Sequence, residues 1–335
     1  MSTTETTAYR WATLTPADLD AWAELVNHLA VVDRTEEFVS AEDLAEELAS
    51  PGHDPERDTW AVWAGERLIA VATVVVPTTP DNEGQARAYL GGGVHAEHRR
   101  RGLGTALFDA AEARGVELLR ERHPGVSAYL SAGGELPGAP VRDLLHDRGY
   151  AIVRYYNFLT RGLDDVPEAP EIEGIELVTP RPEDEEAVRI AHNAAFRDHW
   201  GSGQIDPERW HEHWVSRSSR PALSTLARGV GGEEDGQVLA YILVGQWVER
   251  ESYVNIVGTV PSARGRGLAA AALARTIAVV AATGDFDVIE LDVDSESLTG
   301  ATRLYDRLGF RLKHTTAAMR RPVPGSGPEP APDAG

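Results

Sequence analysis

The stretch VPSARGRGLAAAALARTI, residues 260–277, joins two arginines and two glycines directly to an alanine-rich segment. Alanine favours helix, so the segment predicts a helix that begins on the small residues Gly265, Gly267 and Ala269. The first turn of a helix exposes backbone N–H groups without intrahelical partners, and glycines let an anion approach them closely. The stretch therefore fits a phosphate-binding loop, although a tight turn with solvated arginines explains a single copy equally well.

A second copy of the pattern decides between these interpretations. The segment VHAEHRRRGLGTALFDAAEARG, residues 94–115, repeats the loop and the helix, with Arg99 in the place of Arg264. A further pair of matching segments follows, LLHDRGYAIVRYYNF from Leu144 and LYDRLGFRLKHTTAAM from Leu304. Matching motifs in the same order indicate an internal duplication, and they favour phosphate binding over a plain turn.

The 335 residues divide into two halves with the same predicted order of elements. Each half has a first helix, strands, the Gly/Arg loop with its long helix, and then a strand, a short helix and a last strand. This order predicts an α/β fold with helices packed on a central sheet. We expect domains at residues 1–165 and 173–321, with a Pro-rich acidic linker between them, and a disordered tail at 322–335.

The composition disfavours several classes of function. A formal net charge of −21 argues against nucleic-acid partners, whose phosphates require Lys and Arg. No apolar run has the length of a membrane span and the N-terminus lacks a secretory pattern, so we expect a cytoplasmic protein. We expect a monomer or a homodimer. The lack of cysteine excludes thiolate chemistry. Because His199, His211 and His213 lack the spacing of metal ligands, we expect no metal site.

Both loops, RGRGLA and RRRGLG, fit the pyrophosphate-loop pattern Gln/Arg-x-x-Gly-x-Gly/Ala of the GNAT superfamily of acyl-CoA-dependent N-acyltransferases. From Tyr9 to Arg320 the chain resembles two tandem copies of this family. Residues 291–310, LDVDSESLTGATRLYDRLGF, resemble the second motif of the mycothiol-synthase-like two-domain acetyltransferases. The resemblance implies two GNAT-type domains, each a mixed central sheet with splayed parallel strands flanked by helices, and acetyl-CoA as the acyl donor.

The resemblance also implies which residues bind acetyl-CoA. In the second half the pantetheine amides would pair with strand backbone, the pyrophosphate would sit on the loop amides, and one residue takes the family's asparagine position in the second motif. These residues are Val257, Thr259, Arg264, Gly265, Arg266, Gly267, Leu268, Ala269 and Ser297. The corresponding residues of the first half are Gly92, Val94, Arg99, Arg100, Arg101, Gly102, Leu103, Gly104 and Thr105.

Only the second half carries candidate catalytic residues. The family's general-acid position falls on Tyr305, whose hydroxyl can give a proton to the departing thiolate; simple packing within its helix is the alternative role. The family's base position, often a glutamate, is Tyr253. The aligned residues of the first half are Leu145 and Ala88, which exchange no proton, so we expect that half to be catalytically silent.

Other candidates for the base are Glu251, Asp198, His199 and a relay of water molecules. The helix that carries the tyrosine is expected to begin at Ser297 or Thr299 and to end at Gly309.

We expect the C-terminal domain to move an acetyl group from acetyl-CoA to a primary amine of a small molecule, in mycothiol synthesis or on an antibiotic or another aminated metabolite. Two alternatives stay open. One is a non-catalytic module that binds or senses acyl-CoA. The other is a protein lysine acetyltransferase, whose acidic surface would attract Lys-rich tails.

Overall fold

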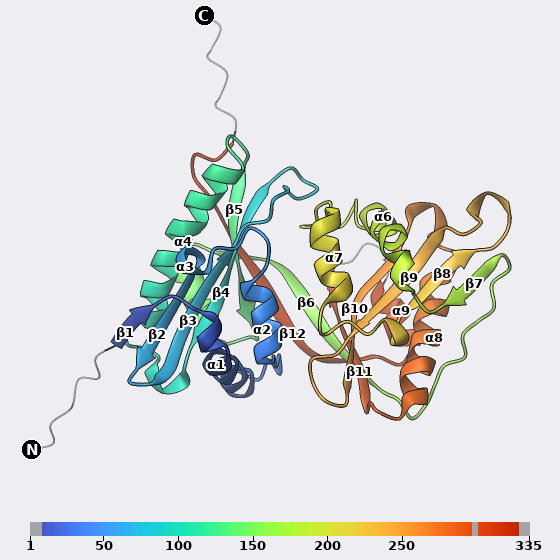
Figure 1. Ribbon diagram of the computed structural model, residues 1–335, viewed down its shortest axis with the longest axis horizontal. Helices are drawn as coiled ribbons and strands as arrows, with labels where there is room; N and C mark the ends of the chain where they lie inside the picture. Colours follow the sequence, from blue (N-terminus) through green and yellow to red (C-terminus); the bar gives the residue numbers. More distant parts are fainter. Residues whose placement is uncertain (1–8, 297–300, 328–335) are drawn as a thin grey trace, which may run out of the picture. The chain divides into compact units, whose positions relative to one another are not determined.

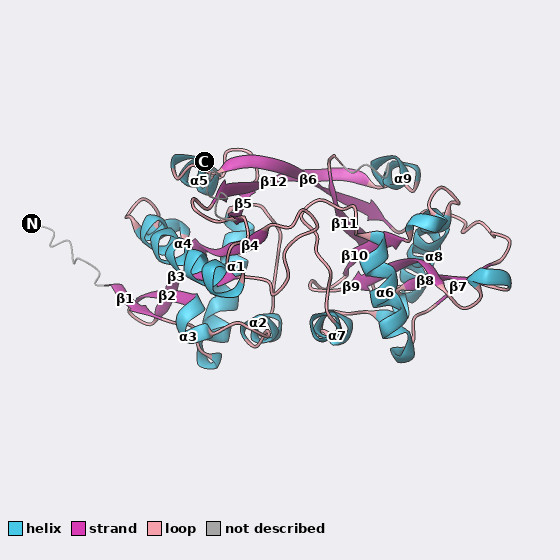
Figure 2. Ribbon diagram, turned by 90° about the horizontal axis from the view of Figure 1, so that it is seen from above, coloured by secondary structure: helices cyan, strands magenta, loops and turns pink. Residues whose placement is uncertain are grey.

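The computed structural model describes residues 9–296 and 301–327, which fold into two compact units (Figure 1). The first unit comprises Met1–Val153 together with Ala317–Gly335, and the second unit comprises Arg154–Thr316. Each unit has helices on both faces of a sheet (Figure 2). Both results agree with the predicted α/β fold of two tandem domains.

The first unit is built on strands that run in the order β1-β2-β3-β4-β5-β12. Among these neighbours only β4 and β5 run parallel in the described pairings. The strands are β1 (Tyr9–Ala12), β2 (Thr59–Ala64), β3 (Arg67–Val75), β4 (Ala86–Val94), β5 (Ala128–Glu135) and the end of β12 (Arg311–Pro322). The helices are α1 (Leu19–Val32), α2 (Ala41–Leu48), α3 (Pro55–Asp58), α4 (Leu103–Arg122) and α5 (Pro140–Asp147).

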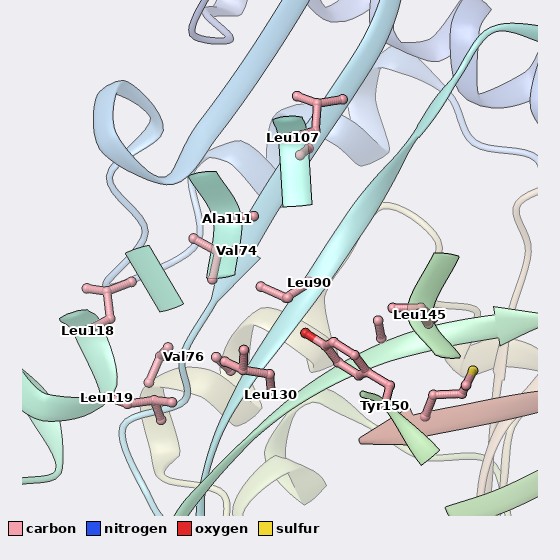
Figure 3. Packing of buried hydrophobic residues seen from close by; sticks show 14 of the residues in the cluster. Val74, Val76, Leu90, Leu107, Ala111, Leu118, Leu119, Leu130, Leu145 and Tyr150 are labelled. Atoms are coloured by element: carbon pink, nitrogen blue, oxygen red, sulfur yellow. The ribbon is translucent and has the colours of Figure 1, made fainter. Parts of the chain in front are cut away.

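Alternation along the strands gives this sheet two apolar faces. On β2, Val62 belongs to the cluster under α4, whereas Ala61 and Trp63 belong to the cluster under α1 and α2. Figure 3 shows the cluster under α4, in which Leu107 and Leu130 are among the buried side chains. Burying each such side chain contributes about 1.5–3 kcal/mol, so both faces of the sheet stabilise the unit.

The second unit repeats the plan with strands in the order β6-β11-β10-β9-β8-β7. Here β10 and β11 form the parallel pair. The strands are β6 (Ala151–Gly162), β7 (Ile175–Val178), β8 (Thr225–Gly229), β9 (Val238–Gly245), β10 (Glu251–Thr259) and β11 (Val288–Asp294). The helices are α6 (Glu185–Ala195), α7 (Pro207–Val215), α8 (Leu268–Thr283) and α9 (Ala301–Arg307).

The two halves of the sequence exchange their last strands. β6, which ends the first half, pairs with β11 of the second unit, and β12, which ends the second half, pairs with β5 of the first unit. Each strand has 12 residues, or about 40 Å. The division between the units falls within both strands, after Val153 in β6 and after Thr316 in β12. The compact units therefore differ from the linear division at residues 165 and 173 in the place of these strands.

An arginine on each exchanged strand caps the short helix of the unit that receives the strand. Arg161 on β6 donates from Nε to the Leu308 carbonyl behind α9 (2.6 Å), and Arg321 on β12 donates to the Arg148 carbonyl behind α5 (3.0 Å). Carbonyls at a helix C-terminus need such donors because the helix offers them none. The same contact in both units shows that the duplication includes the exchange.

The ends of the predicted domains also differ from the structure in one respect. Residues 163–174 form no helix or strand, as a linker would. The predicted disordered tail at 322–335 is wrong for its first residues, because Val323 is 7% exposed in the first unit's core and donates its N–H to the Ala128 carbonyl, while residues 328–335 lie outside the described residues. Ser326 in turn accepts the Ala128 N–H through Oγ (2.9 Å).

Within the described ranges, each helix is too short or too polar to pass through a bilayer.

Candidate active site

The loop before α8 turns on two glycines in the left-handed region. Gly265 has φ 78° and Gly267, the N-cap residue of α8, has φ 81°. A Cβ at either position would meet nothing within 4 Å, so backbone conformation and not space requires glycine there. The first N–H bonded within α8 is that of Ala271, to the Gly267 carbonyl (3.0 Å), so the N–H groups before it have no intrahelical partner.

The two loop arginines form contacts that an anion could replace. Arg266 donates to both carboxylate oxygens of Glu234 (2.8 and 2.9 Å). Arg264 donates to the Ala195 carbonyl (2.8 Å), and its other nitrogen lies 3.5 Å from Asp198. Exposed ion pairs of this kind contribute at most about 1 kcal/mol, so both guanidinium groups can turn toward a phosphate at little cost.

The parallel strands β10 and β11 separate at Tyr253. Their pairing runs from Glu251 opposite Val288 to Tyr253 opposite Glu290 and ends there. Beyond this point β10 continues beside β9 alone, with a register shift that leaves Asn255 opposite no residue of β9. A bulge of this kind bends a strand and increases its twist. One edge of β10, which includes the predicted pantetheine residues Val257 and Thr259, thus has no neighbouring strand in the described pairings.

The bulge also sets which side chains share a face. Val254 belongs to the apolar cluster under α8 and α9, but Ile256, two residues later, belongs to the cluster under α6 and α7. Tyr253 alternates with Val254 and so points to the α6–α7 face. On β11, Leu291 and Val293 belong to the α8–α9 cluster, which places Asp292 between them on the α6–α7 face as well.

Tyr305 lies on the other face, in the α8–α9 cluster, and is 5% exposed. Its helix ends in a Schellman motif, with Phe310 N–H bonded to the Tyr305 carbonyl and Gly309 N–H bonded to the Asp306 carbonyl. The predicted end at Gly309 is thereby confirmed, whereas Ser297 and the expected start at Ser297 or Thr299 lie outside the described residues. Burial, and secondly the charge of Asp292, raises the pKa of Tyr305 well above its usual range, so the hydroxyl stays protonated at neutral pH.

Tyr253 is bonded to a carboxylate that the sequence analysis did not single out. Its hydroxyl donates to Oδ1 of Asp292 (2.7 Å), and the Trp247 ring stands edge-on to the Tyr253 ring, with the centroids 5.8 Å apart. The signal was present in the strand LDVD, where two acids alternate with two buried apolar residues and so share the face opposite the core.

The other candidate bases have different surroundings. Asp198 lies beside Arg264, and His199 Nδ1 lies 3.0 Å from the Ser202 hydroxyl. Glu251 begins β10, two residues before Tyr253, and is half-buried. In the part of the chain that the structure describes, no group of three or more His, Asp or Glu side chains is placed to hold a metal ion.

A buried histidine under the same sheet was also missed. His192 on α6 shares a hydrogen bond of 2.8 Å between Nδ1 and the Tyr241 hydroxyl, and the Tyr241 ring occupies the space that a Cβ on Gly258 would need. Burial, together with the charges of His213 and His199, lowers the pKa of His192 to about 4. This pair packs on the α6–α7 face of β10 at Gly258, five residues beyond Tyr253.

The chain matches known proteins both in sequence and in fold. The sequence profile of the acetyltransferase (GNAT) family matches residues 19–150 and again residues 186–310. The chain belongs to the GNAT family. It is an acetyl-CoA-dependent N-acetyltransferase built from two tandem GNAT domains.

Curated relatives of this acetyltransferase are named mycothiol acetyltransferase. The protein of Mycolicibacterium gilvum (strain PYR-GCK) is 30% identical over 309 residues, which cover 86% of this chain and 94% of the relative. That of Salinispora arenicola (strain CNS-205) is 33% identical over 224 residues, covering 65% of this chain and 67% of the relative.

Two solved structures have the same arrangement of elements. A GCN5-related N-acetyltransferase from Sphaerobacter thermophilus superposes with a TM-score of 0.72 at 28% identity, covering 94% of this chain and 95% of that one. A tandem GNAT protein from the clavulanic acid biosynthesis pathway gives 0.65 at 18% identity, covering 96% of this chain and all of that one. The second likeness concerns the fold alone.

The first unit of this acetyltransferase has the same loop in a different setting. Gly102 has φ 82°, but Arg100, with φ 60°, stands where the second unit has Gly265. Arg99 is forked onto both oxygens of Asp33 (2.8 and 2.6 Å) and also donates to the Val94 carbonyl (2.9 Å). The arginine that corresponds to Arg264 is therefore firmly held within its own unit.

The strands of the first unit separate later than those of the second. β4 and β5 are paired over five residues, up to Leu90 opposite Ala132, whereas β10 and β11 are paired over three, and β4 has no register shift against β3. The space above Gly93, the counterpart of Gly258, is filled by the Leu29 side chain. Leu145, in the position of Tyr305, is fully buried.

Proposed function

We propose that the second unit transfers the acetyl group of acetyl-CoA to a primary amine of a small molecule. The observation that carries the proposal is the separation of β10 and β11 between a phenol on one face of the sheet and a phenol–carboxylate pair on the other. The reacting thioester would lie in the gap, where both faces can reach it.

Each part of acetyl-CoA has a matching feature in this unit. The pantetheine amides would pair with the open edge of β10 at Val257 and Thr259, as a further strand would. The pyrophosphate would sit on the N–H groups of residues 264–269, with the helix dipole of α8 and two arginines adding positive potential. Ser297 would bond the donor near the second motif.

Tyr305 would act as the general acid. The amine nitrogen attacks the thioester carbonyl, the C–S bond breaks, and the sulfur takes the Tyr305 proton; the proton that the new amide loses restores the tyrosine. Because the pKa of Tyr305 is raised, its hydroxyl is a poor acid before the sulfur becomes charged. Proton transfer would therefore accompany cleavage of the C–S bond.

The names of the relatives favour an amine of the mycothiol pathway as acceptor. Tyr253 stands where many family members have glutamate, and Ser297 stands where they have asparagine, so an antibiotic or another aminated metabolite is the second candidate. A pure acyl-CoA sensor needs no phenol beside the thioester, and neither this role nor protein acetylation is favoured by the relatives.

We further propose that the first unit holds no acetyl-CoA. Arg99 is held by two hydrogen bonds to the Asp33 carboxylate. The strands β4 and β5 stay paired for two residues more than β10 and β11, and Leu145 cannot donate a proton. Gly92, Val94 and the loop residues 99–105 would then serve as scaffold. We place the enzyme in the cytoplasm, as a monomer or homodimer without nucleic-acid partners.

Titration calorimetry with acetyl-CoA on the full chain tests both proposals. We expect one acetyl-CoA per chain, followed by release of free CoA thiol when a primary amine is added. Suitable probes are glucosamine, cysteine, spermidine and kanamycin. Two acetyl-CoA per chain would contradict the scaffold role of the first unit, and no binding at all would contradict the proposed function.

A further inference from the structure

Three acidic side chains lie in a row along β11, and the structure distinguishes one of them. Glu290, Asp292 and Asp294 alternate with apolar residues and so share the α6–α7 face of the sheet. Glu290 is bonded to the Lys313 ammonium through both oxygens (3.0 and 3.2 Å). Asp294 lies 3.6 Å from the Arg154 guanidinium and accepts the Glu296 N–H.

Asp292 differs from its two neighbours because no cation is paired with it in the described part of the chain. Its contact there is the Tyr253 hydroxyl, at 2.7 Å from Oδ1. The residue is exposed, so its second oxygen can receive a ligand. A carboxylate held by a cation is disfavoured as a proton acceptor, and Asp292 is therefore the acid of the row that suits this role.

The position of Asp292 fits the chemistry of amine acylation. Asp292 is two residues beyond Glu290, the last residue of β11 paired with β10, so it stands where the two strands begin to separate. Tyr305 lies in the apolar cluster on the opposite face of the sheet, and the Asp292 charge contributes to the raised pKa of Tyr305. An amine that approaches on the α6–α7 face would meet Asp292 before it meets the thioester.

We propose that Asp292, positioned by Tyr253, is the general base that takes a proton from the substrate ammonium group in the second unit. The inference rests on the proposed acetyl transfer. The ammonium gives one proton to the Asp292 carboxylate and becomes a neutral amine, which then attacks the thioester. Asp292 afterwards releases that proton to water, while Tyr305 separately protonates the departing sulfur, so one proton leaves per acetyl transferred.

The proposal moves the base from β10 to β11. Tyr253 occupies the β10 position at which the resemblance expects a base, but a phenol that donates to a carboxylate is not itself the acceptor. Its hydrogen bond instead fixes the orientation of Asp292 and leaves Oδ2 for the substrate. Tyr253 is thus a positioning residue, and the residue it orients is the one that exchanges the proton.

The test compares Asp292→Asn with the wild type in full-length protein, using glucosamine or whichever of cysteine, spermidine and kanamycin the wild type acetylates fastest. We expect kcat/KM to fall about 100-fold or more near neutral pH. The loss should shrink as the pH approaches the pKa of the amine, because solvent then supplies the neutral form. The Kd of acetyl-CoA should not change.

Two further variants separate a chemical role from a structural one. Glu290→Gln removes a carboxylate from the same face of the same strand and should keep wild-type activity at every pH. Tyr253→Phe removes one hydrogen bond from Asp292 and should cost about fivefold in kcat/KM near neutral pH, and this loss should also shrink as the pH approaches the pKa of the amine, because Tyr253 acts through Asp292.

The inference is overturned if Asp292→Asn has the activity and pH profile of the wild type. It is also overturned if the variant loses activity equally at all pH values and binds acetyl-CoA less tightly, since a structural role would give that result. If the wild type itself acetylates none of the four amines, the proposed function fails and the inference fails with it.

Discussion

The two units share a fold and a loop but differ where the central parallel strands separate. In the second unit β10 bulges at Asn255 and leaves β11 after Tyr253, whereas in the first unit β4 runs without a shift and stays paired through Leu90. The Gly/Arg motif is nearly the same in both. Under the proposal that only the second unit binds acetyl-CoA, the loop alone does not make a site.

A working site also needs an open strand edge and side chains on both faces of it. The second unit provides Tyr305 on one face and Tyr253 with Asp292 on the other. The residues of the first unit that align with them in sequence, Leu145 and Ala88, both lie in the apolar cluster on one face of its sheet, under α4. In the proposed scaffold role of the first unit, apolar residues at these positions would stabilise it at no functional cost.

The largest expected effect comes from Tyr305→Phe. Loss of the hydroxyl should lower kcat by a factor of about 10² to 10⁴, because the thiolate would leave without a proton, while the acetyl-CoA Kd stays within about twofold. Steady-state kinetics and calorimetry give both values. Tyr150→Phe, which removes a buried hydroxyl bonded to Glu112 in the first unit, is the control and should leave kcat unchanged. Equal kcat for Tyr305→Phe and wild type would assign Tyr305 to packing.

The second effect concerns acid stability of the second unit. The pKa of His192 is about 4 in the folded state and about 6.5 when unfolded, so the unfolded chain binds the extra proton between these values. Stability should therefore fall as the pH drops, by about 2 kcal/mol between about pH 7 and about pH 5.

Urea unfolding at the two pH values, followed by tryptophan fluorescence, measures this difference. His192→Gln should reduce the pH dependence by that amount. A slope that survives in His192→Gln would show that another group carries it.

A smaller effect distinguishes the two loops through matched glycines. Gly267→Ala and Gly102→Ala place the same side chain at nearly the same φ, 81° and 82°, and neither Cβ meets an atom within 4 Å. Each should cost about 1 kcal/mol of stability, since a left-handed residue with a Cβ is strained. Only Gly267→Ala should weaken acetyl-CoA binding in calorimetry. Weakened binding in Gly102→Ala would show that the first loop also holds the donor.

The smallest effect separates the two Arg–Asp pairs of the loops. Asp33→Asn breaks a half-buried fork with Arg99 and should cost about 1 kcal/mol in thermal or urea unfolding. Asp198→Asn removes an exposed carboxylate 3.5 Å from Arg264 and should change stability by a few tenths of a kcal/mol at most. Equal costs would mean that both loops are held equally firmly.

The family, the duplication and the order of elements were all predicted from sequence alone. The arginines and glycines of residues 264–267 and 99–102 predict a loop before a helix. The turns of this loop have positive φ values, as at Gly267 and Gly102, and glycine adopts such values without strain. Tyr305 was predicted from the resemblance to the family, whereas the end of its helix at Gly309 is a local feature of the sequence.

The folded chain was needed to locate the separation of the strands, the exchange of the last strands and the contact between Asp292 and Tyr253. These facts depend on pairings between residues far apart in the chain, such as Tyr253 with Glu290 and Leu159 with Leu291. A bulge at Asn255 reverses the faces of the residues that follow, and no local propensity reports it. Alternation in LDVD fixes which side chains share a face, but only the packed sheet fixes what they face.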